Sequence, residues 1–324
     1  MSLRGVPVPE LFDRAKAGDR RALGRLLTRV ERGGRPADEI AELTHPLAGV
    51  AHIIGITGAP GAGKSTLTGQ LAASLSAAGN SVAVVAIDPS SPISGGAILG
   101  DRIRMDGVAV AESTFIRSMA TRGHSGGMAL AVPGAIRVLD AVGFDPVIIE
   151  TVGVGQVEVE VAGAADTTVV VVTPGWGDAV QANKAGLLEV ADLFAVNKAD
   201  RPGARDARRD LELMLDLTAV SHHPDVGDWR PPILMTTATV GDGTDELRDQ
   251  INAHRGWLRE SGERDTRRAA RLRTEVHARA LHLLDDALAA RLSADDIDAL
   301  LGDVAGRTIA PSAAAQHVVD ELLG

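Results

Sequence analysis

Residues 52–68, HIIGITGAPGAGKSTLT, contain the pattern on which the expected fold of this chain rests. An apolar run of strand length enters a glycine-rich loop, and the residues after the loop have the pattern of an amphipathic helix. The loop fits the phosphate-binding consensus G-x-x-x-x-G-K-S/T in the strand–loop–helix setting that this consensus requires. Its glycines let the backbone turn N–H groups toward phosphate oxygens, and the following helix adds its positive N-terminal end.

This loop and the first helical turn supply the candidate contacts to a nucleotide. Lys64 is expected to reach the β- and γ-phosphates and to act in catalysis, and the hydroxyl of Ser65 is expected to bind Mg²⁺. We expect Lys64 to lie on an exposed loop, so that its replacement leaves the fold intact. A chance glycine-rich turn is disfavoured because all four fixed positions of the consensus are present. The nucleotide-contacting set here is Gly58, Ala59, Pro60, Gly61, Ala62, Gly63, Lys64, Ser65 and Thr66.

The composition of the 324 residues is that of an ordinary globular protein, with 45% hydrophobic and 23% charged residues. A net charge of −10 disfavours a nucleic-acid partner. The absence of cysteine excludes disulfides and thiolate metal sites, and it fits a cytoplasmic protein. The most apolar runs, 81–87 and 167–173, are far shorter than the roughly 20 residues of a spanning helix, so we expect no membrane segment.

The pattern along the chain predicts an α/β fold with a mostly parallel central sheet flanked by helices. Short apolar runs alternate with longer helical patterns, which is typical of a parallel sheet buried on both faces. We expect a helical N-terminal extension at 1–50, the nucleotide-binding domain at 51–260 and a helical C-terminal arm at 261–324. Strands are expected at 52–57, 81–87, 145–150, 167–173, 192–196 and 232–236, and helices at 64–78, 128–142, 180–190, 205–218 and 243–259.

Two expected strands end in carboxylates. Asp88 follows the strand at 81–87, and Glu150 ends the strand at 145–150 and precedes Gly153. In a parallel sheet the carboxyl ends of the strands share one edge, so both acids could reach a bound Mg²⁺. Asp101 lies in a glycine-rich stretch, where it is either a further metal ligand or only a helix N-cap. The residues themselves therefore indicate Ser65, Asp88 and Glu150 as candidate metal ligands and leave the role of Asp101 open.

A second motif, Asn197-Lys198-Ala199-Asp200, follows the apolar strand at 192–196. The Asp200 carboxylate only accepts hydrogen bonds, which suits the N1–H and amino groups of guanine and not the edge of adenine. Asn197 can contact guanine N7 and brace the phosphate loop, while the Lys198 stem lies along the base. The loop containing Thr237, Ala238 and Thr239 is expected to support the base through backbone N–H groups. Together with the phosphate loop, the motif favours GTP over ATP.

These segments resemble the MeaB/ArgK family of P-loop GTPases. The similarity rests on AIDPSSPISGGAILGDRIRM (86–105), ETVGVGQ (150–156), AVNKAD (195–200) and the loop with Pro60, and it extends over nearly the whole chain. The resemblance implies GTP or GDP with Mg²⁺ at the site, with Ser65, Asp88, Asp101 and Glu150 as the metal ligands, and a catalytic role for Lys64 and Glu150. It also implies methylmalonyl-CoA mutase, a cobalamin enzyme, as the partner whose cofactor is loaded, protected or exchanged. The segment 174–186, with Gln181 and Lys184, matches a loop that responds to nucleotide and partner.

Hydrolysis of GTP needs an oriented water, and no glutamine directly follows Gly153 to supply it; the next is Gln156. We therefore expect slow intrinsic hydrolysis that a partner accelerates. A metal-insertion GTPase would share the core but usually carries Cys- or His-rich sites, whereas here only His222 and His223 are adjacent. A P-loop kinase or a transport-associated NTPase would use ATP, which the guanine motif disfavours.

The C-terminal arm carries an apolar stripe without enough large residues for a core of its own. Its members are Leu272, Val276, Ala280, Leu283 and Leu288, and charged residues such as Arg264, Arg267, Arg268 and Arg271 are expected to cover the other faces. A self-complementary stripe can meet its copy in a symmetric dimer. The family resemblance favours such a homodimer.

Overall fold

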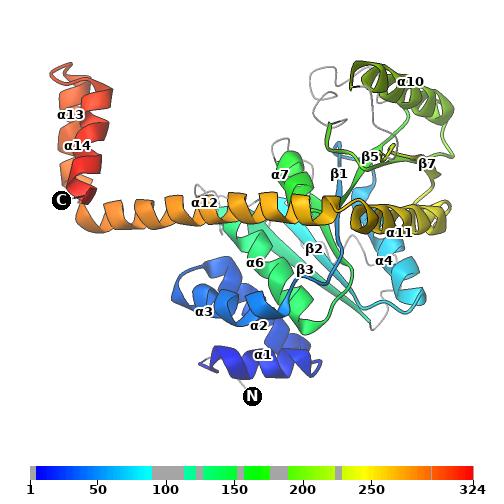
Figure 1. The fold of residues 1–324 in the computed structure, drawn as a ribbon, viewed down its shortest axis with the longest axis horizontal. Helices are drawn as coiled ribbons and strands as arrows, with labels where there is room; N and C mark the ends of the chain where they lie inside the picture. The colour runs from blue at the N-terminus through cyan, green and yellow to red at the C-terminus, as the bar shows by residue number, and fades with distance from the viewer. Residues whose placement is uncertain are drawn as a thin grey trace. The chain divides into compact units, whose positions relative to one another are not determined.

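The structure of the chain is a computed structural model that describes residues 5–89, 113–121, 127–151, 157–175, 189–222, 228–292 and 294–323 (Figure 1). Helices precede, alternate with and follow the strands. The expected helix at 180–190 and the polar loop residues Gln181 and Lys184 lie almost wholly outside the described residues. In chain order the elements are α1 (Val8–Lys16), α2 (Arg20–Arg32), α3 (Arg35–Thr44), the 3₁₀ turn η1 (His45–Leu47), β1 (Ile53–Gly58), α4 (Lys64–Ala77), β2 (Val82–Pro89), β3 (Thr114–Thr121), α6 (Gly127–Val142), β4 (Val147–Thr151), α7 (Val157–Ala164), β5 (Thr167–Val172), β6 (Leu193–Asn197), α10 (Ala204–His222), β7 (Ile233–Thr236), α11 (Thr244–Glu260), α12 (Glu263–Arg291), α13 (Ala294–Ala305) and α14 (Pro311–Leu323).

The described strands form one sheet of seven, in the order β3-β2-β4-β1-β5-β6-β7, and every pair is parallel. The prediction of a mostly parallel central sheet is confirmed. The strand β3 is missing from the expected set. It lies at the sheet edge, where Arg117 interrupts the apolar pattern and bonds Glu31 of α2, so the sequence there lacks the continuous apolar run of a central strand.

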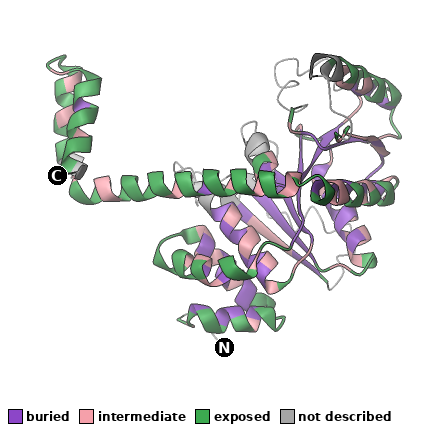
Figure 2. Cartoon of the chain, viewed as in Figure 1, coloured by how far each residue is buried: buried purple, intermediate pink, exposed green. Residues whose placement is uncertain are grey.

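Helices cover both faces of this sheet, and the strands β1, β4, β5 and β6 are buried along their whole length, whereas the edge strands β3 and β7 are partly exposed (Figure 2). Ile54 and Ile56 of β1 point to the face packed by α4 and α11. Ile53 and the neighbouring Val147 and Ile149 of β4 point to the other face, which α6 and α7 cover. The N-terminal helices α1–α3 pack on α6 and share this second core with the sheet.

The chain divides into two compact units, 1–271 and 272–324. The first holds the sheet, the N-terminal helices and the first turns of α12. The second holds the rest of α12 together with α13 and α14, and many of its large apolar residues are exposed. No helix in the described part of the chain is both long enough and apolar enough to cross a bilayer.

Candidate nucleotide-binding site

The loop between β1 and α4 turns at two glycines, Gly58 and Gly63, where the Cβ atom of any other residue would clash with neighbouring atoms. Gly58 has φ 132°, and a Cβ there would lie 2.1 Å from the carbonyl oxygen of Val171. Gly63 has φ 89°, and a Cβ there would lie 2.4 Å from the side-chain nitrogen of Asn197. The first glycine therefore lets β1 leave the sheet beside β5, and the second lets the loop lie against the Asn197 side chain.

Lys64, the first residue of α4, is bound to the loop that precedes it. Its ammonium group donates to the carbonyl oxygens of Gly58 at 2.5 Å and Ala59 at 3.1 Å. The side chain is buried, with only 6% exposed, so the expectation of an exposed loop lysine is wrong. The loop folds over the lysine stem, which leaves the positive charge inside the turn where phosphate oxygens are expected.

Ser65 and Glu150 are brought together from different elements. The Ser65 hydroxyl on α4 donates to the Glu150 carboxylate, which lies near the end of β4 and is 1% exposed. A hydroxyl and a carboxylate are hard oxygen donors of the kind that Mg²⁺ takes. Among the described residues there is no group of three or more His, Asp or Glu side chains that could hold a metal by itself. A cation at this point would depend on phosphate oxygens and water for its other ligands.

The other candidates for the metal site are placed less completely. Asp88 lies at the carboxyl end of β2, one residue beyond the pairing of Ile87 with Thr151. This puts its backbone at the same sheet edge as Glu150. Asp101, Gly153 and Gln156 lie outside the described residues.

The Asn-Lys-x-Asp segment is fastened to the phosphate loop. The Asn197 side chain donates to the carbonyl oxygen of Ala62 at 2.8 Å and accepts from the N–H of Ala238 at 3.1 Å. Lys198 adopts a left-handed conformation, φ 59°, which is uncommon outside glycine, and its ammonium donates to Gly61 O at 2.7 Å. Asp200 follows on the exposed surface. Asn197 thus braces the loop as predicted.

The loop after β7 is held by the same asparagine. Because the Ala238 N–H donates to Asn197, this amide connects two loops in the structure. Thr237 is tied to Asp242 through its own N–H, and Thr239 is exposed. Gly243 closes the turn, since a Cβ there would lie 2.1 Å from the carbonyl oxygen of Met235. The direct role of 237–239 in holding a base stays a prediction.

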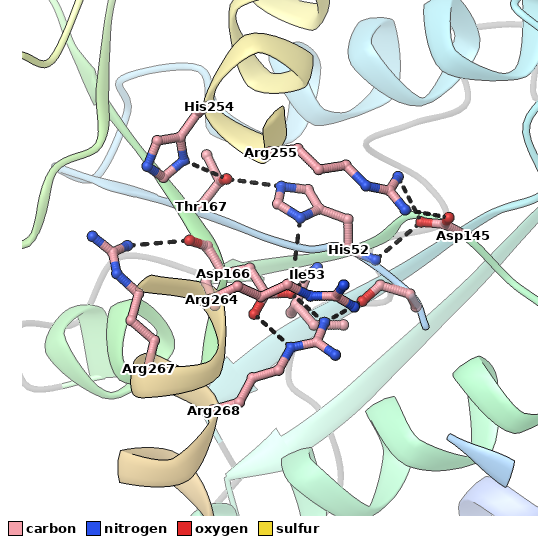
Figure 3. A network of polar contacts seen from close by, with 12 residues as sticks. His52, Ile53, Asp145, Asp166, Thr167, His254, Arg255, Arg264, Arg267 and Arg268 are labelled. Carbon is pink, nitrogen blue, oxygen red and sulfur yellow. Dashed lines mark hydrogen bonds and ion pairs between the residues drawn. The ribbon is translucent and has the colours of Figure 1, made fainter. Parts of the chain in front are cut away.

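A polar network at the opposite, amino edge of the sheet was not anticipated (Figure 3). Three aspartates, each just before a strand, accept backbone N–H groups of a neighbouring segment. Asp166 accepts from Ile53 at 3.0 Å, Asp192 from Thr168 at 2.8 Å and Asp145 from His52 at 3.0 Å. These carboxylates therefore fasten the first residues of adjacent strands to one another.

Arginines from α11 and α12 neutralise these aspartates. Arg268 donates to Asp166 at 2.9 Å, with Arg271 on its other oxygen. Arg267 donates to both oxygens of Asp192 at 3.0 Å, and Arg255 to those of Asp145 at 2.7 and 3.1 Å. These α12 arginines, expected to cover the faces beside the apolar stripe, thus bind buried carboxylates of the sheet. Residues 264, 267, 268 and 271 have the spacing of one helix face. The sequence therefore shows that these arginines could share a partner, but it does not show that the partners are aspartates at the sheet edge.

Burial and charge shift the pKa values in this network in different directions. Burial favours the protonated form of Asp166, but Arg268 and Arg271 outweigh it and hold the pKa of that carboxyl well below its ordinary value. Burial raises the pKa of Asp192 in spite of Arg267. Burial also lowers the pKa of His52 to about 4 and that of His254 to about 3. Both imidazoles are therefore neutral at pH 7.

The two neutral histidines share one hydroxyl. Thr167 lies 2.8 Å from Nε2 of His52 and 2.7 Å from Nδ1 of His254. A hydroxyl has one proton to donate, so Thr167 donates to one ring and accepts from the other. The chain His52–Thr167–His254 lies between two buried carboxylates, because His52 lies 3.8 Å from Asp166 and His254 lies 3.3 Å from Asp192.

These histidines predict that the protein loses stability below pH 6.5. In the unfolded chain an imidazole takes up a proton near pH 6.5, whereas His52 and His254 in the fold resist protonation down to about 4 and about 3. Between pH 6.5 and pH 4 the unfolded state binds more protons, so the free energy of unfolding decreases as pH falls. The expected decrease approaches about 1.4 kcal/mol per pH unit for each histidine. Urea denaturation at pH 7.5, 6.5 and 5.5 measures it.

The variant His52→Gln provides the comparison, because glutamine does not titrate. It should be less stable at pH 7.5 but should show a flatter dependence on pH. His277→Gln, at an exposed position of α12, is the matched control and should keep the wild-type slope. Equal slopes in the wild type and in His52→Gln would contradict the assignment.

A phosphate loop at the carboxyl edge of a parallel sheet, braced by an Asn-Lys-x-Asp motif, defines a P-loop GTPase. The family model of the methylmalonyl-CoA mutase-associated GTPase MeaB matches residues 23–295. The chain belongs to the MeaB family, and the resemblance seen in the sequence is confirmed.

Known relatives agree with this assignment. A candidate GTPase of Pyrococcus abyssi is 45% identical over 317 residues, covering 98% of this chain and 97% of that protein. GTPase ArgK of Escherichia coli is 37% identical over 260 residues, covering 78% and 77%. A fused isobutyryl-CoA mutase of Cupriavidus metallidurans is 39% identical over 236 residues, which is 71% of this chain but 21% of that protein. Among solved structures, an LAO/AO transport system kinase covers both chains fully with a TM-score of 0.69 and 26% identity.

Proposed function

We propose that this GTPase acts in the cytoplasm as a chaperone of an adenosylcobalamin-dependent methylmalonyl-CoA mutase, in the loading, protection or reactivation of the cofactor. The observation that carries the proposal is the family match, together with the relative in which a segment similar to this chain is part of a fused isobutyryl-CoA mutase. In that relative the segment similar to this chain makes up 21% of one polypeptide whose name is that of a mutase. A separate chain of the same family is a natural candidate to meet its mutase as a partner.

The geometry of the site supports a GTP-dependent switch. Lys64 would exchange the carbonyl oxygens of Gly58 and Ala59 for phosphate oxygens, which bear more negative charge. Asp200 would accept from guanine, and Asn197 would hold the phosphate loop in register with the base. The segment that would bind the base is thus in direct contact with the loop that would bind the phosphates. A change at the γ-phosphate can then alter surrounding loops.

Mg²⁺ is part of the proposed site. Ser65 and Glu150 would hold it, with Asp88 and Asp101 as further proposed ligands, because the serine hydroxyl and the glutamate already meet. The cation, when bound, would neutralise charge on the phosphate oxygens. Glu150 is thereby proposed to act in catalysis beside Lys64. We infer that the mutase accelerates hydrolysis by reshaping the loops around this site.

Two other functions fit the same core less well. A metal-insertion GTPase needs a site for its cargo, and the chain has no cysteine; the described residues also hold no cluster of three metal-ligating side chains. A P-loop kinase or a transport-associated NTPase would use ATP. The Asn-Lys-x-Asp motif argues against ATP, because adenine has no N–H groups at the positions where the Asp200 carboxylate would accept them from guanine.

We also propose a homodimer formed through the unit 272–324. Its exposed large apolar residues are an unusual concentration for a surface. They are Leu272, Val276, Leu281, Leu283, Leu284, Ile297, Leu301 and Val319. A second copy offers the same residues, so a two-fold contact would bury both sets at once.

The proposal predicts that purified methylmalonyl-CoA mutase from the same organism raises the GTPase rate. We expect an increase of about tenfold or more, because intrinsic hydrolysis lacks an identified water-orienting residue. GTP turnover is measured with and without the mutase, and with ATP as the alternative substrate. An unrelated acyl-CoA enzyme of similar size is the control. An unchanged rate, with no co-elution of the two proteins in either nucleotide state, would remove the mutase from the proposal.

A further inference from the structure

Two buried threonines occupy equivalent positions at the ends of the adjacent strands β1 and β4. Thr57 precedes Gly58 at the end of β1, and Thr151 follows Glu150 at the end of β4. Both side chains have no exposed surface, and within the described part of the chain neither hydroxyl has a hydrogen-bond partner. A buried hydroxyl left in that state costs about 1–3 kcal/mol, so two neighbouring cases at one point require an explanation.

The two threonines lie on the same face of the sheet. The register pairs Ile56 with Glu150, so Thr57 and Thr151 are the next residues of adjacent parallel strands. Ile53 and Val147, an even number of residues before them, both face the core under α6 and α7. Because side chains alternate along a strand, both threonines point to that same face. Glu150 points to the opposite face, where it meets Ser65 of α4.

The pairing of the strands changes at this level. The ladder between β1 and β4 ends at Ile56 and Glu150. On their outer sides the strands stay paired for longer, β1 with β5 up to Gly58 and β4 with β2 up to Thr151. Among the described residues the ladder between β1 and β4 thus stops one residue before the threonines, although Thr57 and Thr151 are each still paired with the strand on their other side.

We infer that the hydroxyl groups of Thr57 and Thr151 bind one structural water molecule, which bridges the ends of β1 and β4 and positions Glu150 relative to the phosphate loop. Water fits because each hydroxyl can both donate and accept, and a buried water needs two to four polar partners. A metal ion does not fit, because the two hydroxyls carry no charge. The threonines are thus positioning residues for a site that they do not themselves touch.

Thermal unfolding of the full-length protein without nucleotide tests the water. If each hydroxyl is bonded through the water, Thr57→Val and Thr151→Val should each lower Tm by about 2 °C or more. The double variant should cost no more than one single variant, since replacing both partners by apolar groups of equal shape removes the need for the water. If the hydroxyls have no ligand, valine removes a penalty and raises Tm at both positions additively.

Two further threonines serve as controls for the direction in which Tm changes on replacement by valine. The hydroxyl of Thr44 is buried and donates to the carbonyl oxygen of Ile40 at 2.8 Å, so Thr44→Val should lower Tm. Thr68 of α4 is also fully buried, and its hydroxyl has no hydrogen-bond partner within the described chain. Thr68→Val should therefore leave Tm unchanged or raise it. Behaviour of both Thr57→Val and Thr151→Val like that of Thr68→Val would overturn the inference.

GTP turnover tests the positioning role, which rests on the proposed function of Glu150. The valine variants should lower kcat about fivefold or more with GDP affinity unchanged. Thr57→Ser and Thr151→Ser keep the hydroxyl and should keep kcat near the wild-type value. A kcat within twofold of wild type in both valine variants would also contradict the inference. Failure of the proposed function would show differently, as wild-type turnover that does not depend on Mg²⁺.

Discussion

Lys64→Ala is expected to reduce GTP turnover by about 100-fold or more and to weaken nucleotide binding, the largest functional effect of any single change considered. The ammonium group is the cation that the loop encloses, donating to the carbonyl oxygens of Gly58 and Ala59. Alanine leaves the loop without this charge and leaves those two carbonyls without their donor. Steady-state hydrolysis and titration with a fluorescent GDP analogue measure both effects.

The burial of Lys64 makes a folding control necessary. We expect a modest loss of Tm in Lys64→Ala, because the side chain packs inside the loop. Lys16→Ala, an exposed position on α1, is the matched control and should behave as wild type in both assays. Wild-type turnover in a folded Lys64→Ala protein would show that the phosphate site lies elsewhere.

A chain that ends at Arg271 is expected to fold, whereas one that ends at Gly262 is expected to lose most of its stability. The shorter chain lacks Arg267, Arg268 and Arg271 but keeps their buried partners Asp166 and Asp192. Removing one member of a buried ion pair costs about 3–5 kcal/mol. Two such losses approach the 5–15 kcal/mol that stabilises an ordinary domain. Circular dichroism during urea titration compares the two chains.

The same pair of chains tests the proposed dimer. The 1–271 chain should be monomeric by light scattering and should still bind GDP, because every nucleotide motif lies within it. The full-length protein should be a dimer at micromolar concentration. Replacing Asp166 and Asp192 by Asn in the 1–262 chain should recover part of the lost stability, because asparagine carries no charge to leave unpaired. A stable 1–262 chain would contradict the role given to the arginines, and a dimeric 1–271 chain would contradict the role given to the C-terminal unit.

Local patterns in the sequence predict the elements that carry the chemistry. The strand–loop–helix at 52–68 is read from contiguous residues, and β1 and α4 are found where it predicts them. The contact between Asn197 and Ala62 was anticipated only because the motif has a known purpose, since 135 residues separate the partners. The edge strand β3 is not predicted, because Arg117 and Ser118 interrupt its apolar pattern and no other local feature of the sequence indicates a strand there.

The network at the amino edge shows a different limit of sequence reasoning. An aspartate before a strand, such as Asp166 or Asp192, resembles any solvated loop acid until its partner is known. The partners Arg267 and Arg268 lie 75 and 102 residues away, on a helix that joins the edge only in the folded chain. Helical spacing reveals that the arginines share a face, but it does not reveal what that face meets.

The amino-edge aspartates also separate what holds the sheet together from what the sheet does. Asp145, Asp166 and Asp192, which precede β4, β5 and β6, bind backbone N–H groups at the starts of β1 and β5, while the phosphate loop and the base motif occupy the other ends of the strands. Ion pairs and hydrogen bonds thus stabilise the amino edge of the sheet, and the loops that would bind nucleotide extend from the carboxyl edge. Loop sequences can then diverge toward new partners at little risk to the fold, whereas a change in one of these three aspartates threatens every activity at once.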